Sequence, residues 1–179
     1  MAKEYRSKIG LCPLHCKKIK AAEADMEILQ QAVCDTNAYK RLYDHLCKML
    51  LGGYILLGLN HINGRYVAVA KKQMPKSDTF DISLYDVSAS FLYSRICVMS
   101  VELIDEQTVK IIDWYSYIEN EGYGSYFFRT VLAYFRNQGY LYVRGFIGIA
   151  DYDHQEKLKH IYKKFGFDVS DDNRLLLHL

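Results

Sequence analysis

The stretch Trp114-Tyr-Ser-Tyr-Ile-Glu-Asn-Glu-Gly-Tyr-Gly-Ser125 joins a strand-like segment to an amphipathic helical segment. Its two glycines, Gly122 and Gly124, allow backbone angles that other residues avoid and a close approach to a bulky ligand. The first amides of the following helix lack partners within the helix, and the helix dipole adds partial positive charge there. Such a loop suits a phosphate, although many glycine loops before helices are plain turns.

The strand-like segment before this loop and the segments after it together predict the order β-α-β-α-β. The first helix is expected over 124–137 and is ended by Gly139, and a strand is expected over 140–149, which is rich in β-branched and aromatic residues. A second helix over 155–165 precedes Gly166 and a closing strand over 174–179. The two strands that flank the first helix should be parallel, with a right-handed crossover. The apolar faces of the helices comprise Phe128, Val131, Leu132 and Phe135, and Leu158, Ile161, Tyr162 and Phe165.

Antiparallel hairpins are predicted upstream of the loop. Asn63-Gly64, a strong hairpin turn signal, separates the strand segments 54–59 and 65–72. A second pair of strands covers 93–103 and 108–115, with a turn near Asp105. The residues between the two pairs, at 76–78, are expected to form a loop.

Two helices are predicted before the strands. Between Lys17 and Val33 the apolar residues are spaced 3, 4, 3, 4, which makes one stripe. Asp35 and Thr36 offer an N-cap for a second helix, which Gly52-Gly53 ends. The stripe consists of Ile19, Ala22, Met26, Leu29 and Val33, and the expected buried face of the second helix consists of Ala38, Leu42, Leu46, Met49 and Leu50.

These elements predict a single α/β domain over 1–179. A helical part, 1–53, would precede a twisted mixed sheet, 54–179, with helices on both faces. The formal net charge is +2 and no stripe of Lys and Arg dominates, which argues against a nucleic-acid partner. No segment is apolar enough to span a membrane and no secretory signal is present, so a cytoplasmic location with reduced cysteines is expected.

Three linked motifs lie between Val109 and Phe167. They are Glu119-Asn-Glu-Gly-Tyr-Gly124, then Asn137-Gln-Gly-Tyr140 at the end of a helix, and Tyr162-Lys-Lys-Phe-Gly-Phe167. In this order they resemble the GNAT superfamily of N-acyltransferases, whose pyrophosphate loop reads R/Q-x-x-G-x-G/A and whose last helix ends in a pattern like Y-x-K-x-G-F. This chain has Glu119 where the family has Arg or Gln. A carboxylate there would repel a pyrophosphate, and Arg129 is placed to offset it.

The resemblance implies transfer of an acetyl group from acetyl-CoA to an amine that attacks the thioester directly. The pantetheine arm would lie between the strand segments 111–116 and 140–148, where a backbone amide can hold the oxyanion. The amine acceptor is left open. The cofactor contacts that the resemblance implies are Trp114, Tyr115, Ser116, Asn120, Glu121, Gly122, Tyr123, Gly124 and Ser125.

The resemblance also places a catalytic tyrosine at Tyr162, where it would protonate the departing thiolate. Spacing alone fits simple packing of Tyr162 in its apolar stripe. Asp113 and Glu102 are candidates for the general base, beside the 151–154 cluster or an ordered water. The N-terminal helices and the 73–80 loop would shape the acceptor site. Tyrosines that could line it are Tyr85, Tyr93, Tyr115 and Tyr117.

Two other functions fit the sequence. Glu119 favours a non-catalytic GNAT-like module that binds an acyl-CoA or a protein. Cys12, His15 and Cys16 suggest a zinc-dependent interaction protein, in which Cys34, His45 or Cys47 would complete the ligand set. Their spacing matches no common zinc finger, and buried cysteines behave as small hydrophobes, so no metal is predicted. A homodimer is also consistent with the resemblance.

Overall fold

The computed structural model describes the backbone of residues 13–72, 77–88, 94–148 and 154–179. Before Cys34 it describes the side chains of Glu23, Met26, Glu27, Leu29 and Gln30. The chain divides into two compact units, residues 1–40 and 41–179, and the sheet belongs to the second. Within the described residues, no helix has the length and apolar character needed to cross a membrane.

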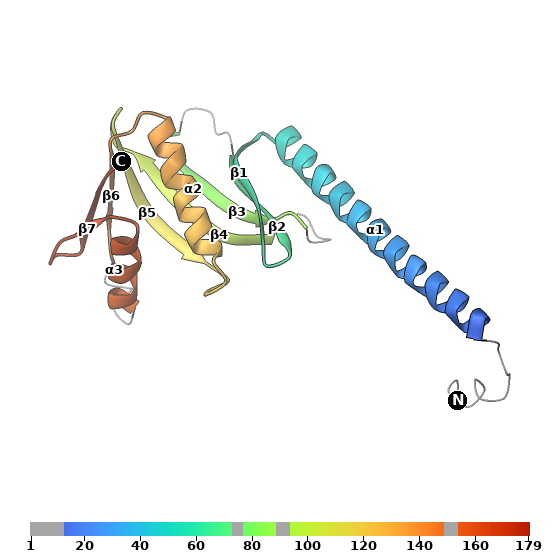
Figure 1. Ribbon diagram of the computed structural model, residues 1–179. Coiled ribbons are helices and arrows are strands. Elements are labelled where there is room, and N and C mark those ends of the chain that lie inside the picture. Colours follow the sequence, from blue (N-terminus) through green and yellow to red (C-terminus); the bar gives the residue numbers. More distant parts are fainter. Residues whose placement is uncertain (1–12, 73–76, 89–93, 149–153) are drawn as a thin grey trace. The chain divides into compact units, whose positions relative to one another are not determined.

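In the part of the chain that the structure describes, eight strands form one mixed sheet in the order β1-β2-β3-β4-β5-β6-β8-β7 (Figure 1). β5 and β6 pair in parallel on either side of α2 (Tyr123–Asn137), as predicted for the crossover, and the other neighbours pair antiparallel. Asn63 and Gly64 both have positive φ, 50° and 76°, as a two-residue hairpin turn requires. The strands are Tyr54–Ile62 (β1), Arg65–Lys72 (β2), Thr79–Asp86 (β3), Ser94–Leu103 (β4), Thr108–Ser116 (β5), Tyr142–Phe146 (β6), Asp168–Val169 (β7) and Arg174–His178 (β8).

The N-terminal helical part is one helix, α1 (Pro13–Leu51), so the predicted division into two helices at Asp35 is wrong. Asp and Thr each cost less than about 1 kcal/mol inside a helix, so an N-cap residue does not by itself interrupt one. Leu50 was expected to be buried and is exposed, whereas Leu42 and Met49 are buried.

β3 is absent from the predicted order, as is the two-residue β7. β3 lies between β2 and β4, and both of its faces are covered from Ile82 to Asp86. A strand that is buried on both faces loses the alternation of apolar and polar residues that identifies half-buried strands. Ser83 and Asp86 are buried polar residues in it, which further obscures the pattern.

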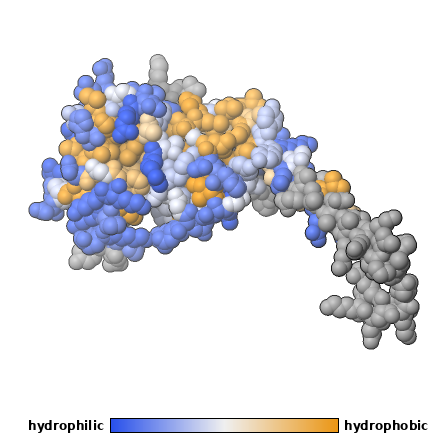
Figure 2. Space-filling view, viewed as in Figure 1, coloured by the Kyte–Doolittle hydropathy of each residue, from blue (hydrophilic) through white to orange (hydrophobic). Residues whose placement is uncertain are grey.

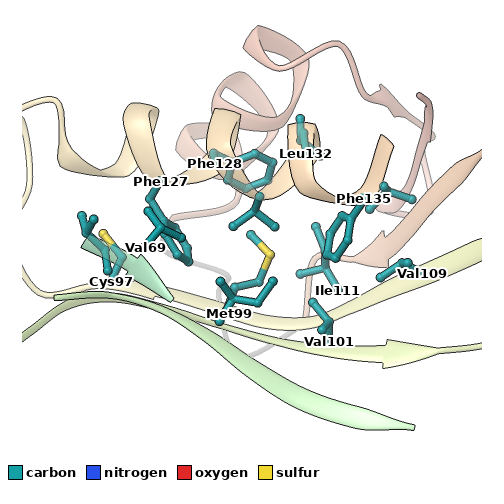
Figure 3. Close-up of a cluster of buried hydrophobic side chains, with 14 of the residues drawn as sticks. Val69, Cys97, Met99, Val101, Val109, Ile111, Phe127, Phe128, Leu132 and Phe135 are labelled. Carbon is teal, nitrogen blue, oxygen red and sulfur yellow. The ribbon is translucent and has the colours of Figure 1, made fainter. Parts of the chain in front are cut away.

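The main core lies between the sheet and α2, whose Phe127 and Phe135 point toward the strands (Figure 3). α3 (Gln155–Lys164) is followed by Phe165, which stacks on Phe128 of α2 with ring centroids 4.4 Å apart. The other face of the sheet carries a second cluster, in which the end of α1 meets β2 and β3. Helices therefore cover both faces, as predicted. The second cluster contains Leu42, Met49, Ala68, Ala70, Tyr85 and Val87.

Apolar side chains also reach the surface. Figure 2 shows hydrophobic surface over the region where α1 ends and β1 begins. Leu50, Leu51 and Ile55 are exposed there.

Candidate active site

β5 separates from its parallel neighbour after three residue pairs. Thr108, Val109 and Lys110 pair with residues 142–144 of β6, and the ladder between the described strands ends there. β5 nevertheless continues to Ser116. Among the described residues, the β6 ladder therefore leaves the backbone groups on this side of 111–116 open to an added chain, because unpaired strand edges take up new hydrogen-bonding partners.

A β-bulge lies in the same part of β5. On the β4 side, Ser100 pairs with Asp113 and Val101 pairs with Ile111, so Ile112 is an extra residue. Bulges bend a strand and increase its twist. The bulge therefore provides a physical reason for the divergence of β5 from β6.

The loop after β5 turns through two left-handed residues, Asn120 with φ 61° and Gly122 with φ 84°. Gly122 is the N-cap of α2, and no side chain caps this end of the helix. The first turn contains no acidic residue. The amides of Tyr123, Gly124 and Ser125 thus have no acceptor within the helix and are available to a ligand, which suits a phosphate.

Trp114 connects the loop to β5. A Cβ on Gly124 would lie 3.4 Å from Cζ2 of Trp114, so the helix backbone passes directly over the indole. The indole also meets Phe128 edge-on, with centroids 5.0 Å apart. Its Nε1 is buried and has no hydrogen-bond partner among the described residues.

Two cations stand at the first turn of α2. Lys164 Nζ lies 3.4 Å from Ser125 Oγ, and Arg129 Nε donates to the Ser125 carbonyl at 3.1 Å. Lys164 comes from the end of α3, so the third sequence motif and the loop meet at Ser125. The sequence motif contained Lys164, but its proximity to the loop could not be inferred without the fold.

Glu119 has a different partner from the one expected. Lys157 of α3 donates to its carboxylate at 2.6 Å, and this hydrogen bond and the charge of Lys157 lower the pKa of Glu119. Arg129, expected to offset Glu119, is engaged by Ser125 instead. The carboxylate at the family's Arg or Gln position is therefore matched by a cation from another helix.

Tyr162 is buried in α3 beside the separated strand. Its ring lies 6.3 Å from that of Trp114 and 5.8 Å from that of Phe128, measured between centroids. Burial fits the packing interpretation, and contact with Trp114 places the same side chain next to β5. The structure thus brings Tyr162, Trp114 and Gly124 together.

The two candidate bases occupy different surroundings. Glu102 accepts a hydrogen bond from Lys110 Nζ at 2.9 Å. Asp113 is exposed, and its Oδ1 accepts from the backbone amide of Trp114 at 2.8 Å. Because Trp114 faces the core, its neighbour Asp113 points to the opposite face of the sheet. Of the alternative cluster, 151–153 lies outside the described residues and His154 is exposed.

The remaining predicted cofactor residues are spread around the loop. Ser116 Oγ donates to the carbonyl of Ile118 at 2.8 Å, and Asn63 of the β1–β2 turn donates to the carbonyl of Glu121 at 3.0 Å. Tyr123 is fully buried, and burial raises the pKa of its phenol. Its side chain therefore belongs to the core. Tyr115 is exposed and stacks edge-on against Tyr117.

Two grooves adjoin these elements. One, of about 560 Å³, is lined mainly by residues of β3, β4 and β5. Its lining includes the buried Tyr85, the polar Asp81 and Ser100, and Ile112, the extra residue of the bulge. The other, of about 860 Å³, runs between β1 and α2 and touches the loop at Gly122. Of the tyrosines expected to line an acceptor groove, Tyr85 lines the groove of about 560 Å³, and Tyr93 lies outside the described residues.

The described side chains contain no group of three or more His, Cys, Asp or Glu placed to hold a metal ion. Cys12 and the side chains of His15 and Cys16 lie outside them. Cys34 is exposed, and His45 Nδ1 is 2.7 Å from the carbonyl of Val87.

Solved structures that match this chain include GNAT acetyltransferases. The match to a GNAT family acetyltransferase from Elizabethkingia anophelis, with acetyl-CoA bound, covers 63% of this chain and 98% of the acetyltransferase. The sequence identity is 12% and the TM-score is 0.49. The PaiA N-acetyltransferase from Thermoplasma acidophilum, in complex with coenzyme A, covers 57% and 62% at 15% identity, with a TM-score of 0.46. The GNAT domain of S. lividans PAT covers 60% and 65% at 12% identity, with a TM-score of 0.46.

No family model matches the sequence, and no curated protein matches it. The family that the three motifs resemble is thus found among solved structures over a segment of the chain. With identities of 12–15% and TM-scores below 0.5, the function has to be derived from the residues of this chain.

Proposed function

We propose that this chain is an acetyl-CoA-dependent N-acetyltransferase that acts on an amine. The observation that carries the proposal is the continuous path from the separated part of β5, through the left-handed loop at Asn120 and Gly122, to the uncapped end of α2. An extended arm with amide groups suits the strand edge, and a pyrophosphate suits the helix end. Coenzyme A carries both groups in one molecule.

The chain's own groups divide the binding between them. Backbone amides from 120 to 125 would hold the pyrophosphate, and Lys164 and Arg129 add positive charge at Ser125. Lys157 keeps the carboxylate of Glu119 from acting as an unpaired negative charge beside the phosphates. Trp114 fixes the spacing between the strand and the loop through its contact with Gly124.

Acetyl-CoA supplies the acyl group already activated as a thioester. The amine nitrogen forms a bond to the acyl carbon, and the bond from that carbon to sulfur breaks. A backbone amide between 111 and 116 would donate to the carbonyl oxygen as negative charge develops on it. Tyr162 would give its phenolic proton to the leaving sulfur, and the proton lost by the amine would go to water or to Asp113. Glu102 is the weaker candidate to accept that proton, because its carboxylate already forms an ion pair with Lys110.

The groove of about 560 Å³ is the proposed route for the acceptor. It includes Ile112, the bulged residue of β5, so it adjoins the point at which the cofactor arm would end. Asp81 and Ser100, joined by a hydrogen bond of 2.7 Å, provide polar groups within it. An amine in this groove would approach the thioester from the side of Asp113.

Turnover on a panel of amines tests the proposal. The panel would contain polyamines, peptides with a free amino terminus, lysine peptides and aminoglycosides, and free CoA thiol would be followed with and without each acceptor. Thiol release that depends on an acceptor, together with an acetylated product by mass spectrometry, is the expected result. Tight binding of acetyl-CoA with no acceptor-dependent release across the panel would instead favour the non-catalytic acyl-CoA-binding module.

A further inference from the structure

The apolar stripe of α1 follows a heptad. Ile19, Met26 and Val33 occupy one position of the repeat, a, and Ala22 and Leu29 occupy the other, d. The spacing 3, 4, 3, 4 is that of a coiled-coil seam. This stripe lies on a helix of 39 residues. In proteins, the stability of such a helix comes mainly from the packing of its apolar face against a partner.

The heptad positions are exposed in the described residues. Met26 and Leu29 expose 60% and 64% of their surface. Beyond Val33 the same register places Thr36 at d and Lys40 at a, so the apolar seam spans residues 19–33. The later d residues Tyr43 and Leu50 are also exposed, at 68% and 54%. Figure 2 shows hydrophobic atoms at the surface of α1.

A different set of α1 positions packs on the sheet. Leu42, His45 and Met49 are buried, and none of the three is an a or d residue of the heptad. His45 Nδ1 contacts the carbonyl of Val87, and Leu42 and Met49 belong to the second core cluster. α1 thus packs on the sheet through Leu42, His45 and Met49, and none of these residues is part of the heptad stripe.

We propose that α1 pairs with α1 of a second copy of this chain as a parallel two-stranded coiled coil. β-Branched residues at a, here Ile19 and Val33, with leucine at d favour two parallel strands. In that arrangement a g residue faces the e residue five positions on in the partner helix. Lys18 at g would then face Glu23 at e, and the opposite charges select the in-register parallel pair.

The mass of the full chain in solution tests the association. Sedimentation equilibrium at micromolar concentration should give about twice the chain mass of 20.9 kDa. Leu29→Lys places two charges in the seam of each dimer and should weaken dimerisation at least about a hundredfold. Glu27→Lys puts the same side chain on an exposed position outside the seam and should leave the dimer intact. A monomeric wild type, or a dimer that Leu29→Lys does not weaken, would overturn the proposal.

Disulfide trapping tests the orientation. With Cys12, Cys16, Cys34 and Cys47 replaced by serine, Leu29→Cys should form an interchain disulfide under mild oxidation, because d residues face each other in a parallel in-register pair. Glu27→Cys should not. A dimer in which neither variant, or only Glu27→Cys, is trapped would contradict the parallel seam. Neither experiment depends on acetyl-CoA, so their failure would leave the proposed activity untouched.

Discussion

Tyr162 combines a packing role with a proposed chemical one. Its ring contacts Trp114, Phe128 and Phe167, and phenylalanine would keep these contacts. Tyr162→Phe is therefore expected to leave the protein folded and its affinity for acetyl-CoA unchanged while kcat falls about a hundredfold or more. Steady-state kinetics and calorimetry on the same preparation separate these effects. An unchanged kcat would assign Tyr162 to packing alone.

The pair of Glu119 and Lys157 should matter for cofactor affinity. Lys157→Ala leaves a carboxylate unpaired beside the pyrophosphate site, so acetyl-CoA should bind about three- to tenfold more weakly, most clearly at low salt. Adding Glu119→Gln to that variant should restore the affinity. Because Lys157 lowers the pKa of Glu119, the wild-type pair persists below the usual carboxyl range and is lost only as the pH falls through the lowered pKa. Equal affinities for the single and double variants would exclude this role.

At the scale of elements, Gly58 sets how closely α2 approaches β1. A Cβ at this position would lie 2.8 Å from the hydroxyl oxygen of Tyr126 and 2.9 Å from Cγ2 of Thr130. Gly58→Ala should lower the free energy of unfolding by about 1–3 kcal/mol in urea titrations. Thr130→Ser removes Cγ2 and should recover part of that loss in the double variant. If the losses of unfolding free energy in the two single variants simply added in the double variant, the added Cβ would not be crowded by Thr130.

The turn between β4 and β5 should be sensitive to acid. The backbone amide of Gln107 donates to Asp105 at 2.8 Å and is the main cause of the lowered pKa of this carboxyl. A lowered pKa in the folded state stabilises the fold above the unfolded pKa, and this contribution disappears as the pH falls through the folded value. Asp105→Asn should therefore reduce the urea midpoint at pH 7, and the difference from wild type should shrink toward pH 3. A difference independent of pH would refute the assignment.

The elements that sequence patterns predicted were those with local signals. The Asn63-Gly64 turn, the apolar face of α2 and the parallel crossover all follow from residues close together in the chain. β3 was missed because both of its faces are covered, by the core under α2 on one side and by the cluster at the end of α1 on the other. The bulge at Ile112 depends on register with β4, which no local pattern specifies.

Contacts between residues far apart in the chain complete the candidate site. Lys157 and Lys164 reach Glu119 and Ser125 across 38 and 39 positions of the chain, so their partners depend on how α3 docks. The sequence predicted the loop and Tyr162 through the resemblance, yet it assigned the balancing charge to Arg129. Local motifs therefore predicted the candidate site, and the docking of α3 determines which charges surround it.

In the proposed function, the uncapped end of α2 binds the pyrophosphate of acetyl-CoA. Ser125→Glu tests it most directly, because a carboxylate at this position suits the helix dipole and should preserve the fold while repelling phosphate. Calorimetric titration should show acetyl-CoA binding to wild type and to the neutral, similarly sized Ser125→Gln, and binding at least about tenfold weaker to Ser125→Glu. Equal affinity of all three proteins, or no binding to wild type at millimolar acetyl-CoA, would contradict the account.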